Sequence, residues 1–188
     1  MDNESKKKYL VSISGPTASG KTLVAEMSAL NTILNKKQKA IYIVPLRALA
    51  SEKYYSFKKQ YPEIKIRLST GELDTEDQSL GGADLIIVTS EKFDSLLRHK
   101  TPWLKNLGTI IIDEIHLLND ASRGPTLEIV IAIIKKELPR AQIIGLSATI
   151  GNPEELAKWL KAELVKDEWR PVKLKKGVYL NGELQFKE

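Results

Sequence analysis

Residues 9–35 read YLVSISGPTASGKTLVAEMSALNTILN and place a glycine-rich turn between an apolar segment and a helical one. The first segment, Tyr9–Ser14, is short and apolar, which predicts a strand, and Thr22–Asn35 has the apolar spacing of a helix. The turn matches G-x-x-x-x-G-K-[ST] in the strand-to-helix context that this phosphate-binding motif requires. Its residues are Gly15, Pro16, Thr17, Ala18, Ser19, Gly20, Lys21 and Thr22.

This motif (Walker A) predicts a site for the phosphates of a nucleotide. Gly15 and Gly20 permit backbone geometry that side chains would obstruct. The N–H groups of the loop and the start of the helix then face an anion. Lys21 would reach the β- and γ-phosphates, and the Thr22 hydroxyl would bind Mg²⁺. The alternative is a plain glycine-rich turn, and the motif alone indicates only that a nucleoside triphosphate binds.

Strand-like and helix-like segments alternate along the rest of the chain. Further strands are predicted at Ala40–Val44, Ile64–Leu68, Leu85–Thr89, Thr109–Asp113 and Gln142–Leu146. Further helices are predicted at Leu46–Lys59, Glu91–Arg98, Pro125–Glu137 and Pro153–Leu160. This order predicts an α/β fold, a doubly wound, mostly parallel sheet with helices on both faces, which binds ligands at the carboxyl ends of its strands.

The length of 188 residues suits one domain. We expect that domain over residues 1–165, followed by a terminal strand or linker over residues 166–188 in which Lys173–Leu180 is one more strand or the start of a link to a further part of the protein. The absence of Cys excludes a disulfide framework, and two His residues disfavour a His-based metal site. Because no apolar run approaches the roughly 18 residues of a membrane span and no secretion signal is visible, we expect a cytoplasmic protein without membrane contact.

The net charge of +5 is unevenly distributed along the chain. Residues 35–67 contain nine Lys or Arg against two acidic residues, whereas the remainder is slightly acidic. Such a segment favours a polyanionic partner, because neutralising phosphates releases counterions. A solvated, lysine-rich helix face is the alternative.

Two adjacent carboxylates, Asp113 and Glu114, follow the apolar run Ile110–Ile112. Adjacent carboxylates beside a buried strand repel each other unless a cation lies between them. We expect Asp113 to hold Mg²⁺ from the side opposite Thr22, and Glu114 to orient and deprotonate an attacking water. The alternative is a solvated strand end.

Asp113-Glu114-Ile115-His116, together with the phosphate-binding turn, resembles the DExH box of superfamily two helicases. Other segments resemble further motifs of that superfamily in order and spacing: Pro45–Ala50, Ser69–Gly71, Thr89–Lys92 and Ser147–Thr149. Three segments resemble the Ski-two-like branch, especially archaeal Hjm-type DNA repair helicases: Arg123–Glu128, Gly151–Leu156 and Trp169–Val172. The resemblance implies a RecA-like P-loop domain, the first motor domain of an ATP-dependent helicase, from an archaeal source.

By resemblance, five residues would line a track for nucleic acid: Pro45, Arg47, Gly71, Thr89 and Lys92. Strand-end loops, helix starts and an Arg can hold phosphates without reading bases, which a translocating motor needs. Otherwise Arg47 and Lys92 lie on solvated helix faces, Gly71 forms a turn, Thr89 ends a strand and Pro45 starts a helix.

His116, by resemblance, lies between the nucleotide and Ser147 or Thr149 and couples hydrolysis to strand movement. It is then a third catalytic residue beside Lys21 and Glu114. Otherwise His116 is a partly buried residue at a helix start, and Ser147 and Thr149 cap the following helix.

The tryptophans could stack on bases. Trp159, however, shares an apolar helix face with Leu156 and Leu160, so we expect it in the core. Trp103 and Trp169 stay undecided.

Two features of the superfamily have no counterpart in the sequence. An adenine-recognising Q motif normally precedes the phosphate-binding turn by some 20 residues, and a second motor domain supplies arginine fingers. We therefore expect these residues to be an excised first motor domain, monomeric and weakly active or inactive alone. Its partners are expected to be the second motor domain of the full-length chain and single-stranded or forked nucleic acid, with DNA favoured over RNA.

The function that these observations predict is ATP hydrolysis with Mg²⁺, coupled to single-strand translocation in the full-length protein. One alternative is a nucleotide-dependent clamp that binds nucleic acid without unwinding it. The other is a P-loop phosphotransferase, which would transfer phosphate from ATP to a small acceptor without stimulation by nucleic acid.

Overall fold

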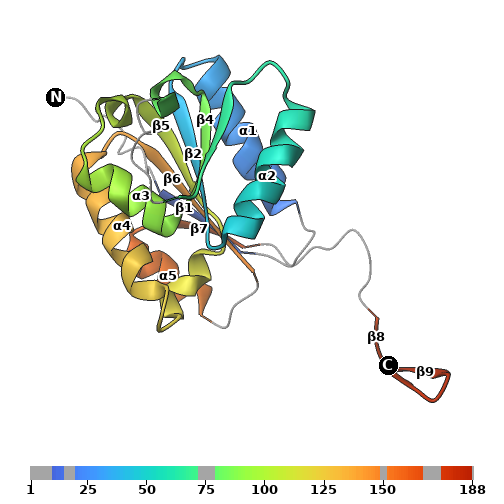
Figure 1. The fold of residues 1–188 in the computed structure, drawn as a ribbon. Coiled ribbons are helices and arrows are strands. Elements are labelled where there is room, and N and C mark those ends of the chain that lie inside the picture. Colours follow the sequence, from blue (N-terminus) through green and yellow to red (C-terminus); the bar gives the residue numbers. More distant parts are fainter. Residues whose placement is uncertain (1–9, 15–19, 72–78, 149–151, 167–174, 188) are drawn as a thin grey trace.

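The computed structural model describes residues 10–14, 20–71, 79–148, 152–166 and 175–187. A parallel sheet forms the centre, and helices cover both of its faces (Figure 1). The strands of this sheet are β1 (Leu10–Ser14), β2 (Lys39–Val44), β3 (Ile66–Ser69), β4 (Leu85–Thr89), β5 (Leu107–Ile112), β6 (Gln142–Ser147) and β7 (Glu163–Lys166). Their order is β3-β4-β2-β5-β6-β1-β7, with parallel pairing throughout.

Helices α1 (Lys21–Leu34) and α2 (Arg47–Gln60) lie on one face of the sheet (Figure 1). Helices α3 (Ser90–Arg98), α4 (Gly124–Glu137) and α5 (Pro153–Leu160) lie on the other. Short 3₁₀ turns connect several elements: η2 (Ser79–Gly82), η3 (Pro102–Asn106) and η4 (Ile115–Asn119). No described helix is long and apolar enough to cross a bilayer.

The two helical layers bury opposite faces of the same strands. Successive side chains of a strand point to opposite sides of the sheet. Ile41 and Ile43 of β2 therefore join the apolar cluster under α3, α4 and α5, whereas Tyr42 and Val44 join the cluster under α1 and α2. A sheet buried on both faces explains why its strands are apolar throughout.

The predicted fold class is confirmed, and most predicted elements agree with the structure to within two residues at each end. Strand β7 was not predicted, because Glu163–Lys166 is short and mostly exposed at the sheet edge. The prediction of a core position for Trp159 is wrong: half of the residue is exposed, with the Lys135 Nζ 5.9 Å from the ring centroid. Trp103 is partly buried against the core, and Trp169 lies outside the described residues.

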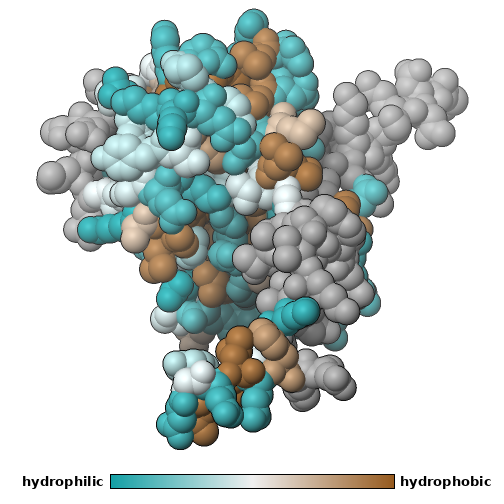
Figure 2. Space-filling model, turned by 90° about the vertical axis from the view of Figure 1, so that its right-hand side faces the viewer, coloured by the Kyte–Doolittle hydropathy of each residue, from teal (hydrophilic) through white to brown (hydrophobic). Residues whose placement is uncertain are grey.

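A two-stranded hairpin follows the sheet in sequence, where one further strand or a link was expected at Lys173–Leu180. It pairs β8 (Lys176–Leu180) with β9 (Glu183–Lys187) in antiparallel register. Asn181 and Gly182 connect the strands with positive φ angles of 50° and 89°, the geometry of a tight hairpin turn. Figure 2 shows apolar residues on the surface of this hairpin, and its side chains Tyr179, Leu184 and Phe186 are all exposed.

Candidate functional site

The residues of the phosphate-binding turn that the structure describes line a cleft with the acidic pair. Gly20, Lys21 and Thr22 lie at the start of α1, and Asp113 and Glu114 follow the end of β5. All five line one cavity of about 570 Å³ at the carboxyl ends of the strands. The remaining predicted residues of this turn, Gly15, Pro16, Thr17, Ala18 and Ser19, lie outside the described residues.

The start of α1 is suited to an anion. Gly20 precedes the helix with φ of 88°, a left-handed geometry that glycine adopts without strain. No side chain caps the helix start, and its first turn contains no acidic residue. The first N–H groups of the helix and the Lys21 side chain therefore present positive potential at the end of the helix where the cleft opens.

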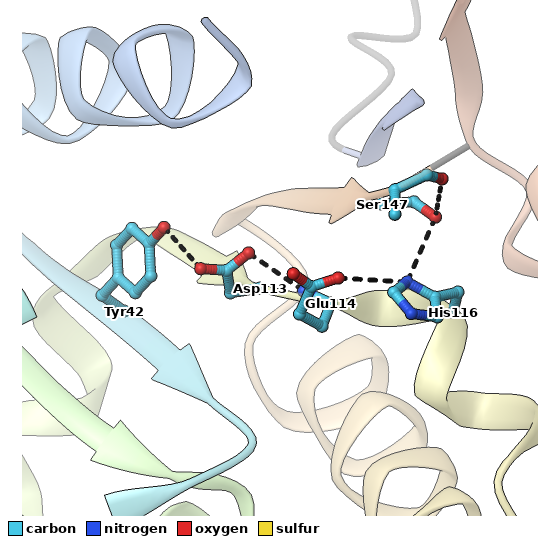
Figure 3. A network of polar contacts seen from close by, with 6 residues as sticks. Tyr42, Asp113, Glu114, His116 and Ser147 are labelled. Carbon is cyan, nitrogen blue, oxygen red and sulfur yellow. Dashed lines mark hydrogen bonds and ion pairs between the residues drawn. The ribbon is translucent and has the colours of Figure 1, made fainter. Parts of the chain in front are cut away.

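Asp113 is held by hydrogen bonds at both carboxylate oxygens. The Tyr42 hydroxyl donates to Oδ2 at 3.0 Å, and the Glu114 backbone N–H donates to Oδ1 at 3.0 Å (Figure 3). Burial raises the pKa of Tyr42 well above its usual value, and the neighbouring Asp113 carboxylate adds to this effect. The phenol therefore keeps its proton and remains the donor.

Glu114 and His116 meet beside the end of β6. His116 Nδ1 lies 3.2 Å from Glu114 Oε2 and 3.5 Å from Ser147 Oγ (Figure 3). The Ser147 hydroxyl donates to the carbonyl of Ala148 at 2.9 Å, so its oxygen is left to accept. Because both neighbours of Nδ1 are then acceptors, we assign the proton of the His116 ring to Nδ1.

The turn that carries Glu114 and His116 is held in place by tight packing against β6. Glu114 has φ of 51°, in the left-handed region, and Ile115 behind it is fully buried. A Cβ on Gly145 of β6 would lie 2.6 Å from Ile115 Cδ1, so only glycine leaves room for this contact. The turn is thereby pressed against β6, which brings His116 to Ser147.

Among the described residues, no group of three or more His, Cys, Asp or Glu forms a metal site. One carboxylate and one hydroxyl, however, suit Mg²⁺, which prefers oxygen ligands and is held in nucleotide sites by few side chains plus the substrate phosphates. Thr22 and Asp113 supply this pair of ligands from opposite elements of one cleft. The residues present therefore fit a magnesium ion.

A second hollow, of about 400 Å³, brings together all five residues predicted to line a nucleic-acid track: Pro45, Arg47, Gly71, Thr89 and Lys92. It lies where β2, β3 and β4 end and where α2 and α3 begin. Arg47 and Gly71 are exposed, and Pro45 is partly buried. Residues as far apart in sequence as Pro45 and Lys92 therefore share one surface through the pairing of three parallel strands.

Two of these five residues are buried, whereas residues that hold a nucleic-acid backbone were expected to face solvent. Lys92 is 4% exposed, so it is neither a solvated cation nor a side chain extended from the surface. Thr89 is equally buried, and its hydroxyl accepts a hydrogen bond from the Lys92 backbone N–H at 3.3 Å as the cap of α3. Arg47 is thus the exposed cation of this set.

For the predicted coupling residues, the structure brings His116 and Ser147 together, whereas Thr149 lies outside the described residues. Ser147 does not cap the next helix, since Asn152 occupies the cap position of α5.

Sequence reasoning missed several residues at the first cleft, among them three with polar side chains that bear on the site. Tyr42 points from β2 toward Asp113, and Glu52 and Lys53 line the cavity from α2. Leu49, Glu52 and Lys53 have the i, i+3, i+4 spacing of one helix face, so the sequence did contain a signal for two of them. It contained no signal for the contact of Tyr42, which depends on strand order.

The comparisons with known proteins agree on one family. The model of the DEAD/DEAH box helicases matches residues 3–156. The ATP-dependent DNA helicase Hel308 of Pyrococcus horikoshii is 55% identical over 168 residues, which are 89% of this chain and 23% of that protein. Hel308 of Methanocaldococcus jannaschii is 54% identical over 187 residues, 96% of this chain and 15% of that protein. The chain therefore spans about a quarter or less of the length of these relatives.

Solved structures agree with this result. The DUF1998 helicase MrfA superposes with a TM-score of 0.72 and 30% identity, covering 84% of this chain and 28% of MrfA. MrfA bound to DNA gives the same TM-score at 29% identity, covering 87% of this chain and 26% of that one. The archaeal relatives confirm the resemblance to the Ski-two-like repair helicases. Since the matched model covers most of its length, the chain belongs to the DEAD/DEAH box helicase family.

Proposed function

We propose that the chain is the first, ATP-binding motor domain of an ATP-dependent DNA helicase. In the full-length protein, hydrolysis of Mg-ATP would be coupled to movement along single-stranded DNA. The observation that carries the proposal is that two sets of motif residues occupy two separate hollows at one edge of the sheet. The names of the relatives, ATP-dependent DNA helicases, and the DNA-bound MrfA neighbour support ATP and DNA as the ligands.

In the first hollow, the start of α1 and Lys21 bind the nucleotide phosphates. Thr22 and Asp113 would hold the magnesium ion, which neutralises charge on the phosphates when it is bound. Glu114 lies next to Asp113 in the same cleft, where its carboxylate orients a water and accepts its proton. Turnover also requires charge stabilisation from the far side of the γ-phosphate, which we assign to an arginine finger of a second motor domain.

The contact of His116 with Glu114 and Ser147 supports a coupling role. The Nδ1–H group bridges the general base and the end of β6, so a change at one shifts the other. Ser147 is the first residue of the segment Ser147–Thr149, which resembles a further motif of the superfamily. We infer that His116 links the state of the nucleotide to movement of that segment.

The second hollow suits the sugar–phosphate backbone of a single strand. The exposed Arg47 side chain supplies positive charge, and α3 begins at the same hollow, which the acidic Glu91 also lines. Because Lys92 is buried and its backbone N–H is bonded to Thr89, we assign it to fixing the start of α3 and not to an extended ammonium group at the phosphate. We further propose that residues 1–165 form this domain and that residues 166–188 lead toward the second motor domain.

Replacing Lys21 with alanine tests the nucleotide site. Loss of a charge-assisted contact, worth about 1.5–3 kcal/mol, should weaken Mg-ATP binding by roughly tenfold or more. Calorimetry on the 188-residue chain measures the effect, with Lys36→Ala, an exposed lysine just after α1, as the matched control. Equal affinity for parent and Lys21→Ala would remove Lys21 from the site.

Replacing Arg47 with glutamate tests the track. Binding of single-stranded DNA should weaken about equally for different base sequences, because phosphate contacts carry no sequence information. The slope of log affinity against log salt should become shallower by about 0.7, the value of one phosphate contact on a single strand. Fluorescence anisotropy across a salt series measures both quantities.

Arg67→Glu is the control for the Arg47 experiment. Arg67 is also exposed and lies in the same basic segment, on β3, but it does not line the hollow. If Arg47→Glu and Arg67→Glu changed the salt slope equally, the overall positive charge of the segment, and not the track, would account for DNA binding.

A further inference from the structure

Tyr42 holds one of the two side chains that we assign to the magnesium ion. Its hydroxyl donates to Asp113 Oδ2 at 3.0 Å. Asp113 follows the end of β5, and the second assigned ligand, Thr22, lies at the start of α1 and lines the same cleft. One buried phenol on β2 therefore contacts the carboxylate side of the proposed metal site.

The position of the phenol is fixed by its surroundings. Tyr42 is fully buried in a strand paired on both edges, between β4 and β5. Its ring packs edge-on against Phe57 of α2, with centroids 5.5 Å apart, and the Lys53 Nζ lies 5.6 Å from the ring centroid. A side chain held in this way cannot follow Asp113 if the carboxylate turns, so it restricts the carboxylate to one orientation.

The hydrogen bonds of the Asp113 carboxylate leave acceptor positions free for a metal ion. Each carboxylate oxygen has two acceptor positions, and the structure uses one on each: Glu114 N–H at Oδ1 and Tyr42 O–H at Oδ2. Asp113 lines the same cleft as Thr22, so its remaining acceptor positions are available to a metal ion bound there. Partners of this kind orient metal ligands, and their loss lowers metal affinity by roughly 10- to 100-fold.

We propose that Tyr42 is a positioning residue that presets Asp113 for the magnesium ion of the nucleotide. The inference rests on the proposed magnesium site. Tyr42 does not touch the reacting atoms itself and acts through this one ligand. The ring alone would fill the core equally well as phenylalanine, so a purely structural role does not require the hydroxyl.

The test separates the hydroxyl from the ring with Tyr42→Phe in the 188-residue chain. ATP affinity is measured by calorimetry with excess Mg²⁺ and again with EDTA, and the ratio of the two affinities gives the magnesium factor. Electron paramagnetic resonance of Mn²⁺ with ATP measures metal binding directly. Thermal unfolding of each variant reports on packing.

Two further variants complete the design. Tyr61→Phe is the matched control, because the Tyr61 hydroxyl donates at the same distance of 3.0 Å to Glu26 Oε2, a carboxylate that lines the same cleft but that we do not assign to the metal. Asp113→Asn tests the metal site itself. Its magnesium factor shows whether the site exists independently of Tyr42.

We expect Tyr42→Phe to lower the magnesium factor and the Mn²⁺ affinity by about tenfold, while ATP affinity in EDTA stays within about twofold. Tyr61→Phe should leave both unchanged. An unchanged or increased factor in Tyr42→Phe, or an equal loss with and without Mg²⁺, would overturn the role of Tyr42. If Asp113→Asn also left the factor unchanged, or if the parent showed none, the proposed metal site would itself be wrong.

Discussion

Replacing Glu114 with glutamine is expected to stop ATP hydrolysis in a polypeptide that joins this chain to a second motor domain. The amide is nearly isosteric, so the neighbouring Asp113 and the left-handed turn at position 114 should be retained. It cannot accept a proton from water, however, and loss of a general base lowers the rate by about 10²- to 10⁴-fold. Binding of Mg-ATP should persist.

Two measurements check this expectation: steady-state phosphate release, and nucleotide affinity by calorimetry. Glu128→Gln, an exposed substitution on α4 outside the nucleotide cleft, serves as the control for removing a negative charge. Parental turnover in the Glu114 variant would place the base elsewhere. Loss of binding together with turnover would instead show that Glu114 holds the cleft together.

The second large expected effect is a low ATPase activity of the isolated 188-residue chain. Lys21 and Thr22 at the start of α1, and Asp113 and Glu114 after the end of β5, line the nucleotide cleft from one domain only. An arginine finger from a second domain is worth about 10³–10⁵ in rate in other phosphate-loop enzymes. We therefore expect the isolated chain to fold as a monomer, to bind ATP weakly and to hydrolyse it near background, without unwinding DNA.

A steady-state ATPase assay with and without a single-stranded oligonucleotide measures this expectation, and the polypeptide with both motor domains is the positive control. Strong, DNA-stimulated turnover by the isolated chain would contradict it. Sedimentation of the same sample then shows whether a second copy supplied the missing half of the site. Transfer of phosphate to a small acceptor, with no response to DNA, would favour a phosphotransferase.

The main features of the fold could be predicted because they depend on local patterns. Apolar runs buried on both faces predicted the strands, and helical spacing predicted the helices between them. The short, exposed β7 had no such pattern, and its place beside β1 follows only from the assembled sheet. The exposure of Trp159 was missed because helical spacing predicts which residues share one face of a helix. It does not predict whether a neighbouring element covers the whole of that face.

The candidate site, too, could be predicted only in part. Ordered motifs indicated both hollows, since the carboxyl ends of parallel strands meet at one edge. The contact between Tyr42 and Asp113 depends on the register of β2 against β5, where Ile43 lies opposite Ile112, and no local pattern contains that register. The burial of Lys92 likewise results from tertiary packing around the start of α3.

The position of β1 has a consequence for synthesis of the protein. The strand that leads into the phosphate-binding turn emerges from the ribosome before the other strands of this sheet, yet its two neighbours are β6 and β7, with Leu10 opposite Ile143 and Val11 opposite Glu163. Pairings of such large sequence separation form slowly, because chain entropy must be lost before they give stability. The nascent chain therefore cannot enclose β1 until Lys166 has left the exit tunnel, and ATP can stabilise the domain only after that moment.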